Sequence, residues 1–276
     1  MKIGEHNSLK VLRDTPHGIF LADEEGEEVL LPGKYLSGDE KEGDVKEVFI
    51  YNDSEDRLVA TTETPKILLN EFAALKVIDV NKNGVFLDWG LEKDLLVPFK
   101  EQNKKMQLGQ TYVVRMYLDE DTDRLVATAK LKKYLSNEEL TIKPGDEVDL
   151  MVFNQSDLGY EMIIDQQHVG LVYRNEVFSP VNIGDKLTGY IKQIRNDGKI
   201  DVSLQPDSAT HIEKSNEVII RALKSNDGVL NLSDKSSPED IYAALNMSKK
   251  TFKKAIGNLY KQRKITIRSG QISFVK

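Results

Sequence analysis

The hydrophobic and polar positions of residues 1–205 alternate in short runs, which Gly, Asp, Asn and Pro interrupt. Alternation with a period of two is typical of strands that bury one face, and the interrupting residues are typical of turns. Asn83-Gly84 and Asp197-Gly198 mark two hairpins, because glycine accepts the positive φ that tight turns demand. The pattern therefore predicts a mostly β region built of short strands.

Short segments of this region recur in the same order, which indicates a duplication. The hexapeptide Asp-Arg-Leu-Val-Ala-Thr occupies residues 56–61 and again residues 123–128. Ahead of it, Gly18 opens a Gly-Ile-Phe-Leu segment that matches Gly-Val-Phe-Leu from Gly84. Because the offset stays close to 66 residues, chance is a poor explanation. The other matched pairs are 30–32 with 96–98 and 43–45 with 109–111.

A third, weaker copy runs from about residue 143 to residue 205. It contains a Gly-Leu-Val-Tyr segment at 170–173 and an Ile-Gly-Asp segment at 183–185. Some five short strands per copy, without a long helical period, are typical of a small closed or partly open barrel. We predict three such barrels, at residues 1–62, 67–130 and 143–205.

The period of the apolar positions becomes helical after Gln205. Residues 206–208 can cap a first helix, and Ser237-Pro238 followed by two acids predicts the start of a second, which ends near Asn246. Ser248 can cap a third helix, and a hairpin follows within 265–274. Helix, turn, helix and hairpin form a winged helix, which we place at residues 207–276. Apolar positions expected in its core are Ile212, Val218, Ile219, Ala222 and Leu223 on the first helix and Phe252, Ala255, Ile256, Leu259 and Tyr260 on the third.

The net charge of −7 is unevenly distributed along the chain. Residues 246–276 contain nine Lys or Arg and no Asp or Glu, which leaves −16 on residues 1–245. A uniformly acidic surface repels phosphate, but this asymmetry suggests a separate, anionic partner for the C-terminal region. A solvated helix that only improves solubility would normally mix both signs of charge.

Composition excludes several classes of protein. The chain has no cysteine, and hence no disulfide, thiolate zinc site or cysteine nucleophile. The sequence contains no run of eighteen apolar residues, so it predicts no membrane span. It has no apolar segment near its start, so it predicts no secretory signal. We therefore expect a cytoplasmic protein with no membrane partner.

The order of segments in each copy resembles the S1 RNA-binding domain, an OB-type barrel. In the third copy, residues 170–172 read Gly-Leu-Val and residues 199–204 read Lys-Ile-Asp-Val-Ser-Leu, close to the family pattern. The first two copies depart from it at Pro32 and Pro98, where proline cannot donate to a sheet and the strand should end.

The predicted winged helix contains two further segments with a specific pattern, residues 236–242 and 248–265. Through them and the order of its domains, the whole chain resembles the conserved virulence factor B family, in which S1-like barrels precede a winged helix. The resemblance implies RNA binding that is coupled to post-transcriptional regulation of gene expression in bacteria.

OB-type barrels bind single strands by stacking bases on aromatic rings, with cations along the backbone. The S1 resemblance assigns one aromatic residue and one cation of each copy to RNA: Phe20 and Arg57, Phe86 and Arg124, and Tyr173 and Lys199.

Alternatives stay open for these residues. Each aromatic could be a core residue of its barrel, and Tyr160 could replace Tyr173 as the ring of the third copy. Tyr51 and Tyr117 match each other across copies and could extend the stacking surface, but they are interpreted as packing residues. The two arginines lie beside several acids and could be ordinary turn charges.

The third predicted helix carries the basic cluster, whose lysines lie one, three and four residues apart on adjoining outward faces. Lysines mainly contact phosphate and read little sequence. Insertion into a DNA major groove, binding to a protein and simple solubility remain alternatives. The predicted nucleic-acid contacts are Lys249, Lys250, Lys253, Lys254, Lys261, Arg263 and Lys264.

No catalytic or metal-binding pattern is evident. The four histidines are scattered, and the chain has neither a phosphate-binding loop nor a nucleophile elbow. We expect no enzymatic activity, no cofactor and no metal, and a monomer that binds single-stranded RNA. The alternatives are a DNA-binding transcription regulator that uses the winged helix and a protein-interaction scaffold.

Overall fold

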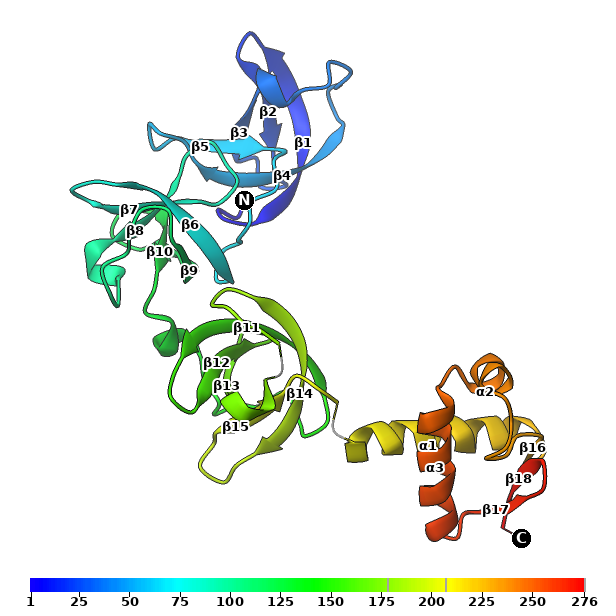
Figure 1. The fold of residues 1–276 in the computed structure, drawn as a ribbon. Helices are drawn as coiled ribbons and strands as arrows, with labels where there is room; N and C mark the ends of the chain where they lie inside the picture. Colours follow the sequence, from blue (N-terminus) through cyan, green and yellow to red (C-terminus); the bar gives the residue numbers. More distant parts are fainter. Residues whose placement is uncertain (178, 207, 276) are drawn as a thin grey trace. The chain divides into compact units, whose positions relative to one another are not determined.

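The computed structural model describes residues 1–177, 179–206 and 208–275, with side chains for all of these except 208–214. The strands of the three barrels lie within residues 6–203, and the α-helices begin at Ser208 (Figure 1). The chain divides into two compact units, of which the first holds residues 1–141 and the second holds the winged helix; the third barrel contributes to both. The predicted fold class is confirmed, with one difference in the second barrel.

The first barrel is closed, with the strand order β1-β2-β3-β5-β4. Its neighbouring strands are antiparallel except β3 and β5, which pair in parallel at Leu30 and Val59. Leu21, Leu31 and Ile50 fill its interior, as the alternating pattern predicts. The strands are β1 (His6–Thr15), β2 (Gly18–Ala22), β3 (Glu28–Pro32), β4 (Val45–Asn52) and β5 (Leu58–Thr61), with the short 3-10 helix η1 (Gly33–Tyr35) after β3.

The second barrel repeats this strand order but forms an open five-stranded sheet, β10-β9-β6-β7-β8. The ring is open between β8 and β10, where the first barrel has its parallel pair. Val85, Leu87 and Val97 are nevertheless fully buried in its core. The elements are β6 (Phe72–Val80), β7 (Gly84–Asp88), β8 (Leu95–Pro98), the 3-10 helix η2 (Phe99–Glu101), β9 (Thr111–Asp119), β10 (Arg124–Thr128) and the 3-10 helix η3 (Leu131–Tyr134).

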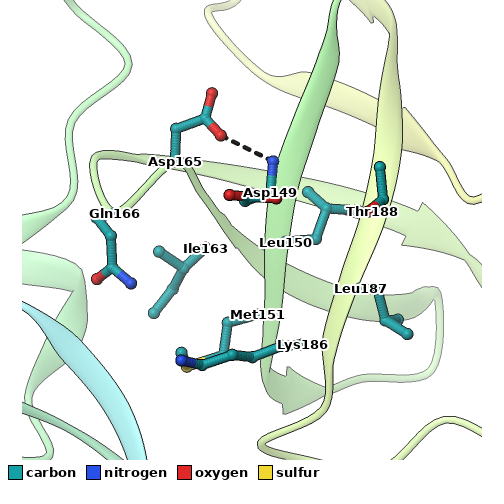
Figure 2. A pocket seen from close by; sticks show the side chains of 9 residues that line it. All are labelled: Asp149, Leu150, Met151, Ile163, Asp165, Gln166, Lys186, Leu187 and Thr188. Atoms are coloured by element: carbon teal, nitrogen blue, oxygen red, sulfur yellow. Dashed lines mark hydrogen bonds between the residues drawn. The ribbon is translucent and has the colours of Figure 1, made fainter. Parts of the chain in front are cut away.

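The third barrel is closed in the same order as the first, β11-β12-β13-β15-β14. A cavity of about 480 Å³ lies beside it, with Met151 and Ile163 as apolar lining and Asp149, Asp165 and Lys186 as charged lining (Figure 2). The Asp165 carboxylate accepts a hydrogen bond from the Asp149 amide at 2.8 Å. The elements are β11 (Glu147–Gln155), β12 (Gly159–Ile164), β13 (His168–Tyr173), the 3-10 helix η4 (Arg174–Glu176), β14 (Lys186–Ile194) and β15 (Ile200–Ser203).

A glycine opens the second strand of every copy, and backbone contact requires it there. A Cβ on Gly18, Gly84 or Gly159 would lie 2.1, 2.2 or 2.0 Å from a carbonyl oxygen of the third strand. The hairpin at Gly84 is confirmed, but the positive φ expected for this glycine is wrong. Glycine is required there because the backbone of the third strand lies too close to leave room for a Cβ. Gly198 does adopt a positive φ of 76° in its turn.

The three copies also share an irregularity in their first strand. A β-bulge interrupts the pairing with the second strand at the same position of each copy. A β-bulge is a specific structural feature that redirects a side chain. Its presence at the same position in all three barrels supports the duplication and includes the third copy in it. The bulges lie between Val11 and Arg13, Val77 and Asp79, and Val152 and Asn154.

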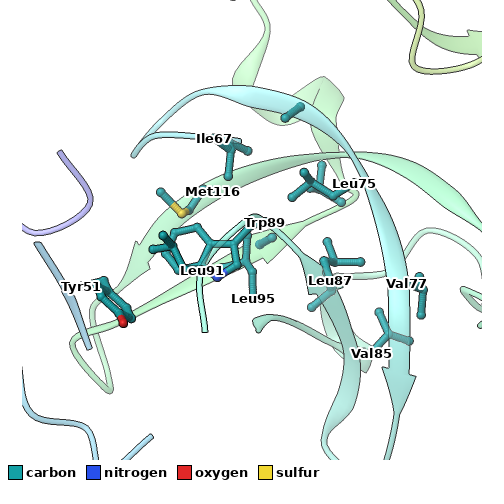
Figure 3. Close-up of a cluster of buried hydrophobic side chains, with 14 of the residues drawn as sticks. Tyr51, Ile67, Leu75, Val77, Val85, Leu87, Trp89, Leu91, Leu95 and Met116 are labelled. Carbon is teal, nitrogen blue, oxygen red and sulfur yellow. The ribbon is translucent and has the colours of Figure 1, made fainter. Parts of the chain in front are cut away.

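The first two barrels share one hydrophobic cluster. Along β4, Val48 and Ile50 point into their own barrel, whereas Phe49 and Tyr51 pack with residues of the second barrel. Trp89 is 2% exposed and meets Phe49 and Tyr51 edge to face, with ring centroids at 5.8 and 6.1 Å (Figure 3). The packing role expected for Tyr51 is therefore confirmed, and both faces of β4 are buried from Val48 to Tyr51.

The C-terminal region is a winged helix whose caps lie where the sequence predicts them. The Ser237 and Ser248 side chains accept hydrogen bonds from the amides of Asp240 and Thr251, and Asn246 ends α2 in the left-handed region. The sequence pattern missed a short strand, β16, which completes the sheet β16-β18-β17. The elements are α1 (Ser208–Ser225), β16 (Val229–Leu230), α2 (Pro238–Leu245), α3 (Lys249–Lys261), β17 (Ile265–Arg268) and β18 (Gln271–Phe274).

One predicted core residue of α3 is wrong. Phe252, Ala255, Ile256 and Leu259 are buried, but Tyr260 is 57% exposed. The buried residues already form a complete stripe, so a fifth apolar position one residue beyond Leu259 turns toward solvent. On α1, Ile219 and Leu223 are buried and Ala222 packs against them, but Val218 is exposed. Asp207 and the side chain of Ile212 lie outside the described part of the chain.

Candidate nucleic-acid interface

Phe20 lies on the outward side of β2, between Ile19 and Leu21, which point into the first barrel. Its ring is half-buried, and the Arg13 guanidinium carbon lies 4.3 Å from the ring centroid. Glu28 accepts two hydrogen bonds from Arg13, at 2.9 and 2.6 Å, which lowers the pKa of the Glu28 carboxyl. Arg13 is a bulge residue opposite Phe20 and was missed, because its register is not evident from local sequence.

Phe86 and Arg124 line one cleft of about 390 Å³, which is formed by residues of both the first and the second barrel. Phe86 is half-buried, as Phe20 is. Arg124 forms an ion pair with Asp56, a residue of the first barrel that also meets Lys93 at 3.2 Å. The structure thus brings together a predicted ring and a predicted cation.

The walls of this cleft suit the edge of a base better than a phosphate. Glu92 and Asp94 line it, and burial, followed by the neighbouring carboxylates of Asp88 and Asp79, raises the pKa of Asp94. The Asn52 side-chain oxygen also belongs to a lining residue, and it is buried without a hydrogen-bond partner in the described chain. It is a polar atom that the described protein leaves unsatisfied.

Arg57 and Lys199 are held by carboxylates of their own turns. Arg57 meets Asp53 at 2.6 Å and Glu55 at 2.8 Å, and Lys199 meets Asp197 at 2.8 Å. Both cations remain well exposed. These contacts agree with the alternative that both residues are ordinary charges of their turns. An RNA phosphate would have to compete with the neighbouring carboxylates for these two cations.

Tyr173 is half-buried, and its hydroxyl accepts a hydrogen bond from Arg195. Arg195 in turn donates to Asp201 at 3.0 and 2.6 Å. Tyr173 pairs with Gly159, as Pro32 and Pro98 pair with the glycines of their copies. The position of Phe20 is taken here by Glu161, which pairs opposite the bulge residue Asn154. The third barrel therefore presents a different surface from the first two.

The cations of the winged helix differ from those of the barrels. Among the described residues, none of the seven predicted contacts forms an ion pair with a carboxylate, whereas the three predicted barrel cations all do. Six of them are exposed and Lys249 is half-buried. This region thus presents positive charge that no described carboxylate compensates.

The described residues hold no group of three or more His, Asp or Glu side chains that could bind a metal ion. In the same part of the chain, no helix combines the length and apolar character needed to cross a membrane.

The comparisons with known proteins agree with this architecture. The S1 domain family matches residues 3–63 and 71–130, and the CvfB-like winged helix domain matches residues 217–274. YitL of Bacillus subtilis (strain 168) is 30% identical over 285 residues, which cover 98% of this chain and 93% of the relative. Conserved virulence factor B of Staphylococcus aureus (strain USA300) is 28% identical over 291 residues, which cover 99% of this chain and 94% of the relative.

This chain belongs to the conserved virulence factor B family. The resemblance of its sequence to that family is thereby confirmed over nearly its full length. A multidomain protein with nucleic acid binding domains from Streptococcus pneumoniae is 24% identical over 99% of this chain and 98% of that one, but its TM-score of 0.40 is too low to carry an argument. The S1 and winged-helix domains of this family member indicate nucleic-acid binding.

Proposed function

We propose that the protein binds single-stranded RNA and acts as a post-transcriptional regulator without catalytic activity. The observation that carries this proposal is the set of cations on α3 and after it that have no described carboxylate partner, whereas the three predicted barrel cations are each held by a carboxylate. Uncompensated cations attract a polyanion, because they release counterions from phosphate when it binds.

The outward rings of Phe20 and Phe86 support RNA over duplex DNA as the ligand. Stacking on an aromatic ring requires an unpaired base, which a duplex does not offer. The protein is expected to act as a cytoplasmic monomer. Binding of an RNA strand to one barrel or to the winged helix raises the effective concentration of that strand for the neighbouring domain.

Competition binding tests the choice of ligand. Labelled single-stranded RNA bound to the full chain should be displaced by unlabelled poly(U) or poly(A), and poorly by random duplex DNA at equal nucleotide concentration. Efficient displacement by the duplex would overturn the proposal in favour of a DNA-binding transcription regulator.

Salt dependence tests the role of the basic cluster. With about four phosphate contacts, the slope of log affinity against log salt should be about −3 for a single strand. Changing Lys250, Lys253, Lys254 and Lys261 to Gln should move this slope clearly toward zero in a filter-binding titration, while the three predicted cations left in place retain part of it.

A matched control removes the same charge from the barrels. Lys2, Lys34, Lys66 and Lys132 each have a carboxylate partner, so their change to Gln should leave the slope near −3. Equal slopes for both fourfold variants would contradict a specific role for the winged helix.

A further inference from the structure

Two features of α3 work against the stability of this helix. Gly257 lies in its interior, where glycine is less favourable than almost any other residue. Lys249 and Lys250 occupy the first turn, which contains no acidic residue, so positive charge meets the positive end of the helix dipole. Residues that disfavour the secondary structure in which they lie, without a neighbouring residue that offsets the cost, are expected at functional sites.

Packing does not account for Gly257. Among the described residues, a Cβ built on Gly257 would meet no atom within 4 Å, and its backbone does not have a positive φ. Alanine would therefore fit the fold and favour the helix. A side chain at this position would instead stand in the path of a ligand that approaches the helix from outside.

The surroundings of Gly257 are suited to a single-stranded polyanion. Residues three and four apart share a helix face, so Lys253, Lys254, Tyr260 and Lys261 surround Gly257 on α3. The lysines are exposed and have no described carboxylate partner, and the Tyr260 ring is 57% exposed. We call these five residues the α3 platform.

We propose that the α3 platform binds one nucleotide of a single strand at close range. The base stacks on the Tyr260 ring, the sugar-phosphate backbone passes over Gly257, and the lysines contact the flanking phosphates. Stacking requires an unpaired base, which separates this mode from insertion of α3 into a DNA major groove. The inference rests on the proposed function and adds a defined site to it.

Tyr260→Ala in the full chain tests the stacking. Loss of one stacked base should weaken binding of a labelled single-stranded oligonucleotide by about 5- to 150-fold in fluorescence anisotropy. Tyr260→Phe should retain the affinity. Tyr242, which is 63% exposed on α2, provides the matched control, and Tyr242→Ala should bind as the unchanged chain does.

Gly257→Gln tests the close approach, because stability and binding should change in opposite directions. The variant should raise the melting temperature of the winged helix by about 2–8 °C, since glutamine favours helix. It should also weaken single-strand binding at least about 5-fold, since its side chain stands where the backbone of the strand passes.

The outcomes separate this inference from the proposed function. If Tyr260→Ala and Gly257→Gln bind RNA as tightly as the unchanged chain, the α3 platform is overturned while RNA binding stands. Equal weakening of single-strand and duplex binding by Tyr260→Ala would overturn the stacking mode. If the unchanged chain binds no RNA and α3 instead captures an acidic peptide, both proposals fail.

Discussion

Trp89→Ala is expected to lower the free energy of unfolding of the first two barrels by about 3–5 kcal/mol, the usual loss for a buried tryptophan. Trp89 is 2% exposed within the cluster that both barrels share. Its removal leaves a cavity and also deletes the edge contacts to Phe49 and Tyr51. The effect should therefore reach the first barrel, although Trp89 belongs to the second.

Urea unfolding followed by circular dichroism measures the loss, and hydrogen exchange on β4 and β9 locates it. Trp89→Phe, which keeps a ring in place, should lose clearly less. The chain has a single tryptophan, so its fluorescence reports on this cluster in the unchanged protein. A loss below about 1 kcal/mol for Trp89→Ala, or one confined to the second barrel, would contradict a shared core.

The double change Phe20→Ala and Phe86→Ala should abolish most of the barrels' contribution to RNA binding. Each stacked base contributes about 1–3 kcal/mol, so the two together should weaken binding by a factor between about 25 and 25,000. Both rings are half-buried on the outward side of their strands, and their neighbours along the strand already fill the cores.

Filter binding with a single-stranded oligonucleotide measures this loss. Phe99→Ala is a suitable control, because Phe99 is an exposed ring of the second barrel that belongs to no predicted contact. Melting temperatures of the variants should stay close to that of the unchanged chain. Unchanged RNA affinity in the double variant would favour a protein-interaction scaffold in which the acidic barrels do not touch nucleic acid.

The repeat and the helix caps could be predicted because they depend on residues close together in the chain. The recurrence of 56–61 at 123–128 marks equivalent strands, β5 and β10. Ser237 and Ser248 cap the helices that follow them, since a cap involves only residues two or three positions away. The two-residue strand β16 escaped prediction, because its partner β18 lies about 40 residues further along the chain.

The candidate site was predicted less completely, because contacts between copies decide much of it. Arg124 and Asp56 are 68 residues apart in the chain, yet they form an ion pair across the cleft. Arg13 covers Phe20 only because a β-bulge places the two residues opposite each other. Local sequence contains neither relation.

The sequence by itself determined the order of strands, turns and helices, the three copies and the excess of positive charge at the C-terminal end. These properties follow from periodicity, turn residues and composition, which act locally or add up along the chain. Only the tertiary structure decided that both faces of β4 are buried from Val48 to Tyr51, that the three predicted barrel cations pair with carboxylates, and that Tyr260 is exposed beside the lysines of α3. Burial and ion pairing depend on which distant residues meet, and folding alone brings those residues together.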